Sequence, residues 1–377
     1  MLGLLLFVAI VALIFLPFNW IAIRQLRRIH PRRKTWILGA AIAGNLLWPF
    51  FPVMRASTDV SRLVRSVLGP VWWGWSMFAV VYTFFVLVML LVWLPFRKRR
   101  PFAQFAHIPS RVFLILLLLG FLAGYYQALV PLRVERVTIP VAGLAQPVRL
   151  ALLGDLHIGL FTRPSRLTRI FATVTALQPD AALIAGDLID DDPYFVPKLL
   201  RGTDALATDI PLYAVFGNHE MYGDPAEVYA RLQGSRIRLL VNEGVALRGV
   251  WIAGLSDRDA RQMDDPKQRV LFRPDLGKAL AGRPPSAVPI VLAHNPAVLD
   301  EVRKHNIPVA LCAHTHGGQF GYRPWGLSLA GLFLKHHMGY YDEPPTQLYI
   351  NTGTGYWWFP FRLGMTPEIT LIELQPR

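Results

Sequence analysis

The pattern of hydrophobic and polar positions divides the chain near residue 146. Before that point, apolar residues run almost without interruption through four stretches, at 2–23, 35–54, 71–96 and 112–130. A helix that crosses a bilayer needs about 20 mostly apolar residues, and each stretch reaches about that length. We therefore predict an all-α membrane domain of four transmembrane helices in residues 1–140. The first stretch lacks the basic flank and the small-residue cleavage site of a signal peptide, and we expect it to be retained.

Beyond residue 146, short apolar runs alternate with amphipathic stretches. Buried strands are predicted at 148–154, 181–186, 211–217, 250–254, 288–293 and 308–313. Between two of them, Asp224 as N-cap, Pro225 at the first helical position and Gly234 at the end predict a helix. Buried strands that alternate with helices are typical of an α/β sandwich. We expect this second domain to cover residues 141–377.

Charge follows the same division of the chain. Residues 1–146 contain 16 Lys and Arg but only two acidic residues, whereas the remainder contains 23 of each sign. These basic residues lie between apolar segments and do not form the continuous basic surface that binds nucleic acid. We therefore expect no nucleic-acid partner. The loops at 24–34 and 97–111 hold six and five basic residues, and the loop at 55–65 holds three. The positive-inside rule then places the C-terminal domain outside the cytoplasm.

The apolar stretches contain no Asp, Glu, Lys or Arg. Transport and proton relay usually require such groups within the membrane, so we expect the helices to anchor the chain or to form a platform that handles lipid. The chain has one cysteine, Cys312, which excludes an intrachain disulfide and a cysteine-rich metal site.

Residues that can bind metals follow five of the predicted strands. They are Asp155 and His157, Asp187, Asn218 and His219, His294, and His314 and His316. Sites in open α/β folds form outside the carboxyl ends of the strands, so these side chains could converge. Any one pair would be better explained as a turn or a core histidine, but five in register favour a metal site. Oxygen and imidazole ligands without thiolate suit Mn, Fe or Zn.

The series G-D-L-H, G-D-L-I-D, G-N-H-E, a later histidine and H-T-H-G-G-Q closely resembles the calcineurin-like metallophosphoesterase superfamily over about residues 147–377. The ending at 349–374 resembles its membrane-associated bacterial branch. The resemblance implies an α/β metallophosphoesterase domain, a β-sandwich flanked by helices. One departure is Ala313, where the family usually has a glycine before H-T-H, and a positive φ at this alanine would be strained.

The resemblance also implies roles for the candidate residues. Asp155, His157 and His316 would bind one of two divalent metal ions, Asn218, His294 and His314 would bind the other, and Asp187 would bridge both. His219 would be the general acid, while a water whose pKa is lowered by the two cations would supply hydroxide for in-line displacement.

The leading hypothesis is a membrane-anchored dinuclear-metal phosphoesterase that acts on a phosphodiester or pyrophosphate. A lipid-linked substrate is suggested only by the anchor and by the aromatic residues 356–361. One alternative is a cytoplasmic-facing nucleotide-lipid pyrophosphatase, if the topology is inverted. The other is a non-catalytic metal-binding membrane sensor or scaffold.

Several further residues near these motifs are weighed. We interpret 190–192 as a solvated acidic cluster at a helix start and 335–337 as a surface loop. Glu220 is expected to support the metal ligands. Asp257 and Arg258 are considered as residues that line the pocket, and Arg362 is considered as a phosphate ligand. The aromatic rings at 357, 358, 359 and 361 are predicted to meet the bilayer.

Overall fold

The computed structural model describes residues 2–45, 59–357 and 359–377. Its contacts divide the chain into two compact units, Met1–Gly120 and Phe121–Arg377. The helices of the first unit are α1 (Leu2–Ile29), α2 (Lys34–Asn45), α4 (Asp59–Trp93) and most of α5 (Phe102–Leu129). The last residues of α5 belong to the second unit, as does β1 (Arg133–Val141). This division lies upstream of the domain boundary suggested at residue 140, which stays a prediction.

Two helices among the described residues are long and apolar enough to cross a membrane. They are Leu68–Phe96 and Phe102–Leu129, and they correspond to the third and fourth predicted stretches. The prediction of four such helices is therefore corrected to two for the part of the chain that the structure describes. The described side chains of α1 begin at residue 15 and include three arginines, and the 12 residues of α2 are too short for a span. The rest of the second stretch lies outside the described residues.

The second unit contains two six-stranded mixed sheets. The order of the first sheet is β1 (Arg133–Val141), β14 (Glu368–Pro376), β2 (Val148–Leu153), β3 (Ala181–Ala185), β4 (Leu212–Val215) and β5 (Ile237–Leu239). The order of the second is β12 (Gly339–Glu343), β13 (Thr346–Ile350), β9 (Val309–Cys312), β8 (Val288–Leu292), β7 (Val250–Gly254) and β6 (Glu243–Leu247). Strands β2 to β5 are parallel to one another, and so are β7, β8, β9 and β13.

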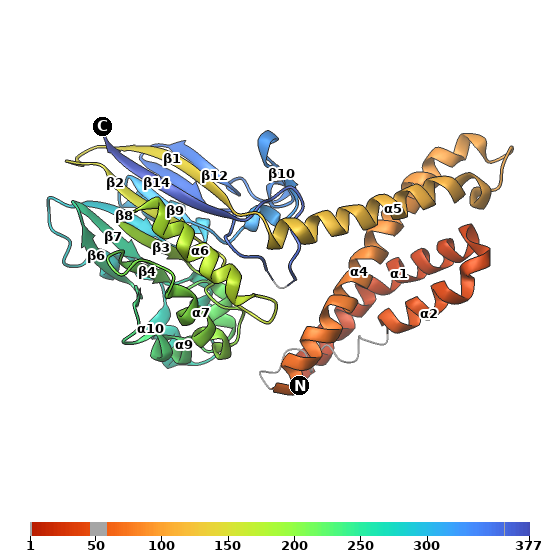
Figure 1. The fold of residues 1–377 in the computed structure, drawn as a ribbon, viewed down its shortest axis with the longest axis horizontal. Coiled ribbons are helices and arrows are strands. Elements are labelled where there is room, and N and C mark those ends of the chain that lie inside the picture. Colours follow the sequence, from red (N-terminus) through yellow and green to blue (C-terminus); the bar gives the residue numbers. More distant parts are fainter. Residues whose placement is uncertain (1, 46–58, 358) are drawn as a thin grey trace. The chain divides into compact units, whose positions relative to one another are not determined.

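The alternation of side chains along the strands builds the layers. In β2, Leu150 and Leu152 face a core shared with strands of the second sheet, while Ala151 and Leu153 face the helices, as the period of two requires. Helices α6 (Pro164–Leu177), α7 (Val196–Thr203) and α9 (Pro225–Leu232) cover the first sheet (Figure 1). Helices α11 (Leu276–Leu280) and α12 (Leu299–Lys304) cover the second. The predicted β-sandwich flanked by helices is confirmed.

The six predicted buried strands all form, as β2, β3, β4, β7, β8 and β9. Helix α9 begins where the sequence predicts, because the carboxylate of Asp224 accepts a hydrogen bond of 3.0 Å from the backbone N–H of Glu227. The remaining short elements are α8 (Asn218–Tyr222), α10 (Pro266–Phe272), β10 (Gly321–Tyr322) and β11 (Leu327–Ser328), together with single 3₁₀ turns.

Candidate metal centre

The seven predicted metal ligands follow the carboxyl ends of β2, β3, β4, β8 and β9, and one of them, Asn218, begins helix α8. The first three of these strands are parallel neighbours in one sheet, and the last two are parallel neighbours in the other. The carboxyl ends of both sets meet at one edge of the sandwich. Six of the ligands are buried, and the seventh, His314, is half-buried.

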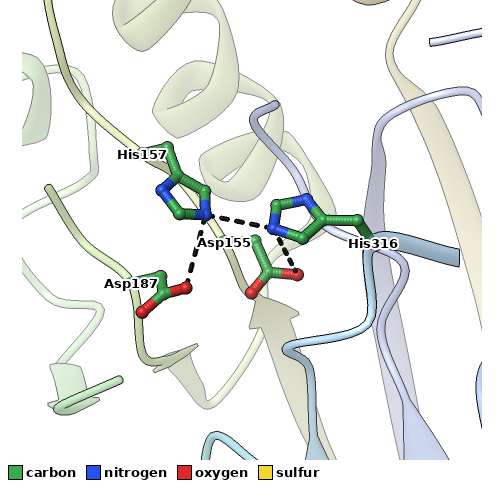
Figure 2. Close-up of side chains that lie close together, drawn as sticks. All are labelled: Asp155, His157, Asp187 and His316. Carbon is green, nitrogen blue, oxygen red and sulfur yellow. Dashed lines mark hydrogen bonds and ion pairs between the residues drawn. The ribbon is translucent and has the colours of Figure 1, made fainter. Parts of the chain in front are cut away.

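Four of these side chains form a first group. Nε2 of His157 lies 3.0 Å from Nε2 of His316 and 3.3 Å from Oδ2 of Asp187 (Figure 2). Oδ2 of Asp155 lies 3.9 Å from Nε2 of His316. The ligand atoms of all four residues lie within 4.8 Å of one another, a separation that one metal ion between them can span.

The other three side chains form a second group around the amide of Asn218. Its Oδ1 lies 2.9 Å from Nε2 of His294 and 2.9 Å from Nδ1 of His314, and these two nitrogens are 3.0 Å apart. Nε2 of His294 also lies 3.2 Å from Oδ2 of Asp187. The same carboxylate oxygen of Asp187 therefore faces both groups.

The donor set fits two divalent cations. Oδ2 of Asp155 is buried and accepts no hydrogen bond from any described residue, which is costly unless a cation satisfies it. Imidazole nitrogens, carboxylate oxygens and one amide oxygen converge without a thiolate, and such ligands suit borderline divalent metals. The buried Asp and His cluster thus fits a dinuclear divalent metal site.

The backbone of this centre is strained. Five of the predicted ligands have positive φ, namely Asp155 (50°), His157 (41°), Asp187 (51°), His314 (76°) and His316 (53°). Such residues cost about 1–3 kcal/mol each and cluster at functional sites. Ala313 is not among the described residues with positive φ, so the departure from the family glycine costs no strain there. Gly154 provides the space, because a Cβ on it would collide with that of Ala313.

The buried carboxylates need positive charge beside them. Burial raises the pKa of Asp155 to about 6. Burial would also raise the pKa of Asp187, but the charges of His294 and His157 hold it well below its usual range. Burial would lower the pKa of His157, but the charge of Asp187 and a hydrogen bond with it raise that pKa to about 10. The opposite pKa shifts of the carboxylate of Asp187 and the imidazole of His157 come from their mutual attraction.

His219 lies beside the centre and is held by acidic residues. Its Nδ1 is 2.5 Å from Oδ1 of Asp191, and Nδ1 of His157 is 3.5 Å from Oδ1 of Asp190. The interpretation of 190–192 as a solvated cluster at a helix start holds for Asp191, which is exposed but also contacts His219. It is wrong for Asp192, which is buried although it caps a 3₁₀ turn. The sequence feature that could have predicted these contacts is the position of Asp190 and Asp191, three and four residues after Asp187 on the same loop.

Two other acidic residues support the ligand loops. Glu220 accepts hydrogen bonds from the backbone N–H groups of Ile189 (3.1 Å) and Gly217 (2.8 Å), which ties together the loops after β3 and β4. This is the supporting position expected for it. Asp257 is buried, and burial raises its pKa to about 6, whereas its neighbour Arg258 is exposed.

Arg362 lies beneath the centre and not in an open pocket. The guanidinium is fully buried, donates a 2.7 Å hydrogen bond to the carbonyl of Thr352, and places Nη2 3.2 Å from Nδ1 of His316. Gly353 makes room for it, since a Cβ there would collide with Nη2 of Arg362 and lie 3.1 Å from Oδ2 of Asp155. The interpretation of Arg362 as a phosphate ligand is therefore wrong, and its contact with a predicted metal ligand was missed.

Two of the other residues considered lie next to the site. The hydroxyl of Thr315, between two predicted ligands, donates to the carbonyl of His337 at 2.6 Å, and the ring of Trp357 lies 6.2 Å from that of His219. Lys335 and His336 both contact the Glu343 carboxylate at 3.0 Å. Lys335 is exposed, as a surface loop requires, whereas His336 and His337 are half-buried. Among the aromatic residues, Phe359 and Phe361 are buried and pack against rings of α5. Trp357 is exposed, and Trp358 lies outside the described residues. The predicted bilayer contact of these rings is thus corrected for the two phenylalanines, which are covered by protein.

Comparisons with known proteins show which sequences this chain is similar to. The profile of the family described as calcineurin-like phosphoesterase matches residues 148–318. An uncharacterized metallophosphoesterase of Helicobacter pylori is 31% identical over 70% of this chain and 69% of its own length. A transmembrane protein with metallophosphoesterase domain from Danio rerio is 32% identical over 67% of this chain and 59% of its own length. The protein of the same name from Bos taurus is 30% identical over 67% and 59%.

Proposed function

This chain belongs to the calcineurin-like metallophosphoesterases, and from that premise we propose that it hydrolyses a phosphodiester or pyrophosphate bond with two divalent cations. The observation that carries the proposal is the position of Asp187. Its Oδ2 lies 3.3 Å from Nε2 of His157 and 3.2 Å from Nε2 of His294. One carboxylate oxygen between two imidazoles is the arrangement that a bridging ligand requires.

The ligand sets are assigned from the two groups. Asp155, His157 and His316 would hold one cation, Asn218, His294 and His314 the other, and Asp187 both. When bound, the two cations supply Lewis-acid charge to the phosphoryl oxygens and lower the pKa of a water. The donor set favours Mn, Fe or Zn.

His219 is assigned the transfer of a proton to the leaving oxygen. Its Nδ1 contacts Asp191, which fixes the ring orientation and leaves Nε2 to act on the substrate. Burial lowers the pKa of His219, but the hydrogen bond with Asp191 and the charges of Asp187 and Asp191 outweigh this, so the pKa is raised. A raised pKa favours the protonated ring, the form that a general acid needs.

The substrate is proposed to be held at a membrane. Two helices among the described residues are apolar and long enough to span a bilayer, and two relatives are named transmembrane proteins. The charge bias of the loops favours a multi-pass protein whose catalytic domain lies outside the cytoplasm. The phosphoester of a membrane lipid would then lie close to the catalytic domain.

The assignment is tested on the purified full-length chain by metal content and by hydrolysis of bis-p-nitrophenyl phosphate. Asp187→Asn should lower both the metal content and the activity more than Asp155→Asn, because only Asp187 serves both groups. The control Asp264→Asn removes an exposed carboxylate and should behave as wild type. Wild-type metal and activity in Asp187→Asn would refute the assignment. Metal without hydrolysis in wild type would favour the sensor or scaffold.

A further inference from the structure

The unit that contains the metal centre, Phe121–Arg377, is called the catalytic unit below. It also has an exposed loop, residues 322–334, which we call the apolar loop. Its side chains include Trp325, Leu332 and Phe333, which are 75%, 74% and 81% exposed. Four further large apolar residues of the loop are exposed as well: Tyr322, Leu327, Leu329 and Leu334. Contiguous apolar surface of this kind marks a contact with a protein or a membrane.

The apolar loop has a defined backbone. Strands β10 and β11 pair as a short hairpin, and the N–H of Leu329 donates to the carbonyl of Phe320 at 2.8 Å. The N–H of Gly331 donates to the hydroxyl of Ser328 at 2.9 Å. The apolar side chains are therefore exposed by a folded scaffold. The loop also abuts the metal centre, since a Cβ on Gly318, two residues after His316, would collide with Leu329 and Ala330.

The loop is joined by contacts to the last turns of α5, within the same unit. The ring of Phe320 lies 5.1 Å from that of Phe361, which lies 5.7 Å from that of Phe121 in α5. The backbone N–H of Arg362 donates to the carbonyl of Gly124 at 3.0 Å. The apolar loop therefore has a fixed position relative to the C-terminal end of this helix.

The position of these contacts along α5 determines how deep the apolar loop would lie in a bilayer that this helix crosses. The apolar helix ends at Leu129, and the contacts at Phe121 and Gly124 lie about 8–12 Å before that end at the rise of an α-helix. Tyr125 and Tyr126 are both exposed at the same level, and tyrosines are enriched where a spanning helix meets the headgroups. If α5 spans the bilayer, the apolar loop lies at the membrane interface and not above it.

We propose that the apolar loop inserts into the headgroup and acyl boundary of the bilayer that α5 crosses. The occupant of this surface is lipid, because Phe320, next to the loop, packs through Phe361 onto a helix that is itself apolar enough to span. Exposed Trp, Phe and Leu side chains are those that interfacial segments bury in membranes. The inference does not require hydrolysis. If the proposed function also holds, the loop brings the metal centre to the level of lipid phosphates.

The test uses the full-length chain reconstituted in phosphatidylcholine vesicles. Phe333→Cys is labelled with the fluorophore NBD, and quenching by a doxyl-labelled phosphatidylcholine is measured. The native Cys312 is fully buried, so the label goes to the new cysteine. Val270→Cys is the matched control, because Val270 is 75% exposed on α10 and equally apolar. Leu118→Cys, exposed on α5, reports whether this helix is in the bilayer.

The expected result is that the doxyl lipid removes most of the emission at Phe333 and at Leu118 but leaves Val270 unchanged. Quenching at Leu118 without quenching at Phe333 would overturn the proposal, since the loop would then face water. Absence of quenching at Leu118 would overturn it too, because α5 would not lie in the membrane. Hydrolysis of bis-p-nitrophenyl phosphate is measured on the same samples. A quenched loop in a protein without hydrolysis would refute the proposed function and leave the membrane contact intact.

Discussion

His219 contacts an acidic residue on one side and lies next to the ligand Asn218 on the other. His219→Ala should keep both cations, because neither ligand set includes it, and should lower turnover by about 10²–10⁴-fold, the usual contribution of a general acid. Metal per chain and the rate on a diester with a poor leaving group are the measurements. The metal assay is needed because His157, Asp190 and His219 also lie close enough to hold an ion. Loss of metal, or full activity on the poor leaving group, would contradict the role.

Arg362 combines complete burial with contacts to Thr352 and His316. Arg362→Met should weaken metal binding and activity by about 10–100-fold, as removal of groups that orient metal ligands does. Arg236→Met is the matched control, since the guanidinium of Arg236 donates to the backbone carbonyls of Thr203 and Leu206, away from the metal groups. It should lower the melting temperature and leave the metal affinity unchanged. Equal metal affinities of the two variants would show that Arg362 is only structural.

At the level of single residues, the sequence indicated which side chains gather but not which contacts orient them. Asp155, Asp187 and Asn218 each follow a strand in an obvious way, and the structure brings them together. The contact of Asp191 with His219 depends on the path of a loop with positive φ at Asp191 itself. Arg362 reaches His316 across 46 residues of chain. Neither contact leaves a periodic signal in the sequence.

The strands that the sequence predicted differ in their residue pattern from the strands that it missed. The six predicted strands are buried on both faces, and such strands are continuous apolar runs. β1 and β14 were missed because each mixes charged and apolar positions over nine residues. Their parallel pairing joins residues more than two hundred positions apart, and no local pattern reports such a distance.

Helix α5 offers a test of its attachment to the catalytic unit. A Cβ on Gly124 would lie 2.6 Å from the ring of Phe361, whereas a Cβ on Gly120 meets nothing within 4 Å. Gly124→Ala should therefore displace the segment that carries Arg362, at a cost of about 1–3 kcal/mol from overpacking. Gly120→Ala has the same gain in helix propensity without the clash and should not destabilise the protein. Thermal unfolding of the two full-length variants in detergent compares them, and equal midpoints would contradict the packing.

For the whole molecule, the sidedness of the catalytic unit follows from loop charge alone. The loops at 24–34 and 97–111 carry the largest numbers of basic residues, so we expect an alkaline phosphatase fused after residue 140 to be active. A stably expressed but inactive fusion would place the domain in the cytoplasm and favour the nucleotide-lipid alternative. The sidedness also depends on how many helices cross the membrane. The sequence predicted four, and the structure supports two of them among the described residues. The fusion is thus the direct measurement.

The division of the ligands between two sheets also has a consequence for synthesis. The loops of the first sheet carry Asp155, His157, Asp187 and Asn218, and those of the second carry His294, His314 and His316. A nascent chain that ends before residue 294 can fold much of the first sheet, yet it holds a complete ligand set for neither cation. All seven candidate ligands are therefore present only once synthesis has passed His316, while β10 to β14 are still to come. If the ligand sets are as proposed, metal can be captured only late in synthesis, and chains that end before that residue should not hydrolyse a phosphoester.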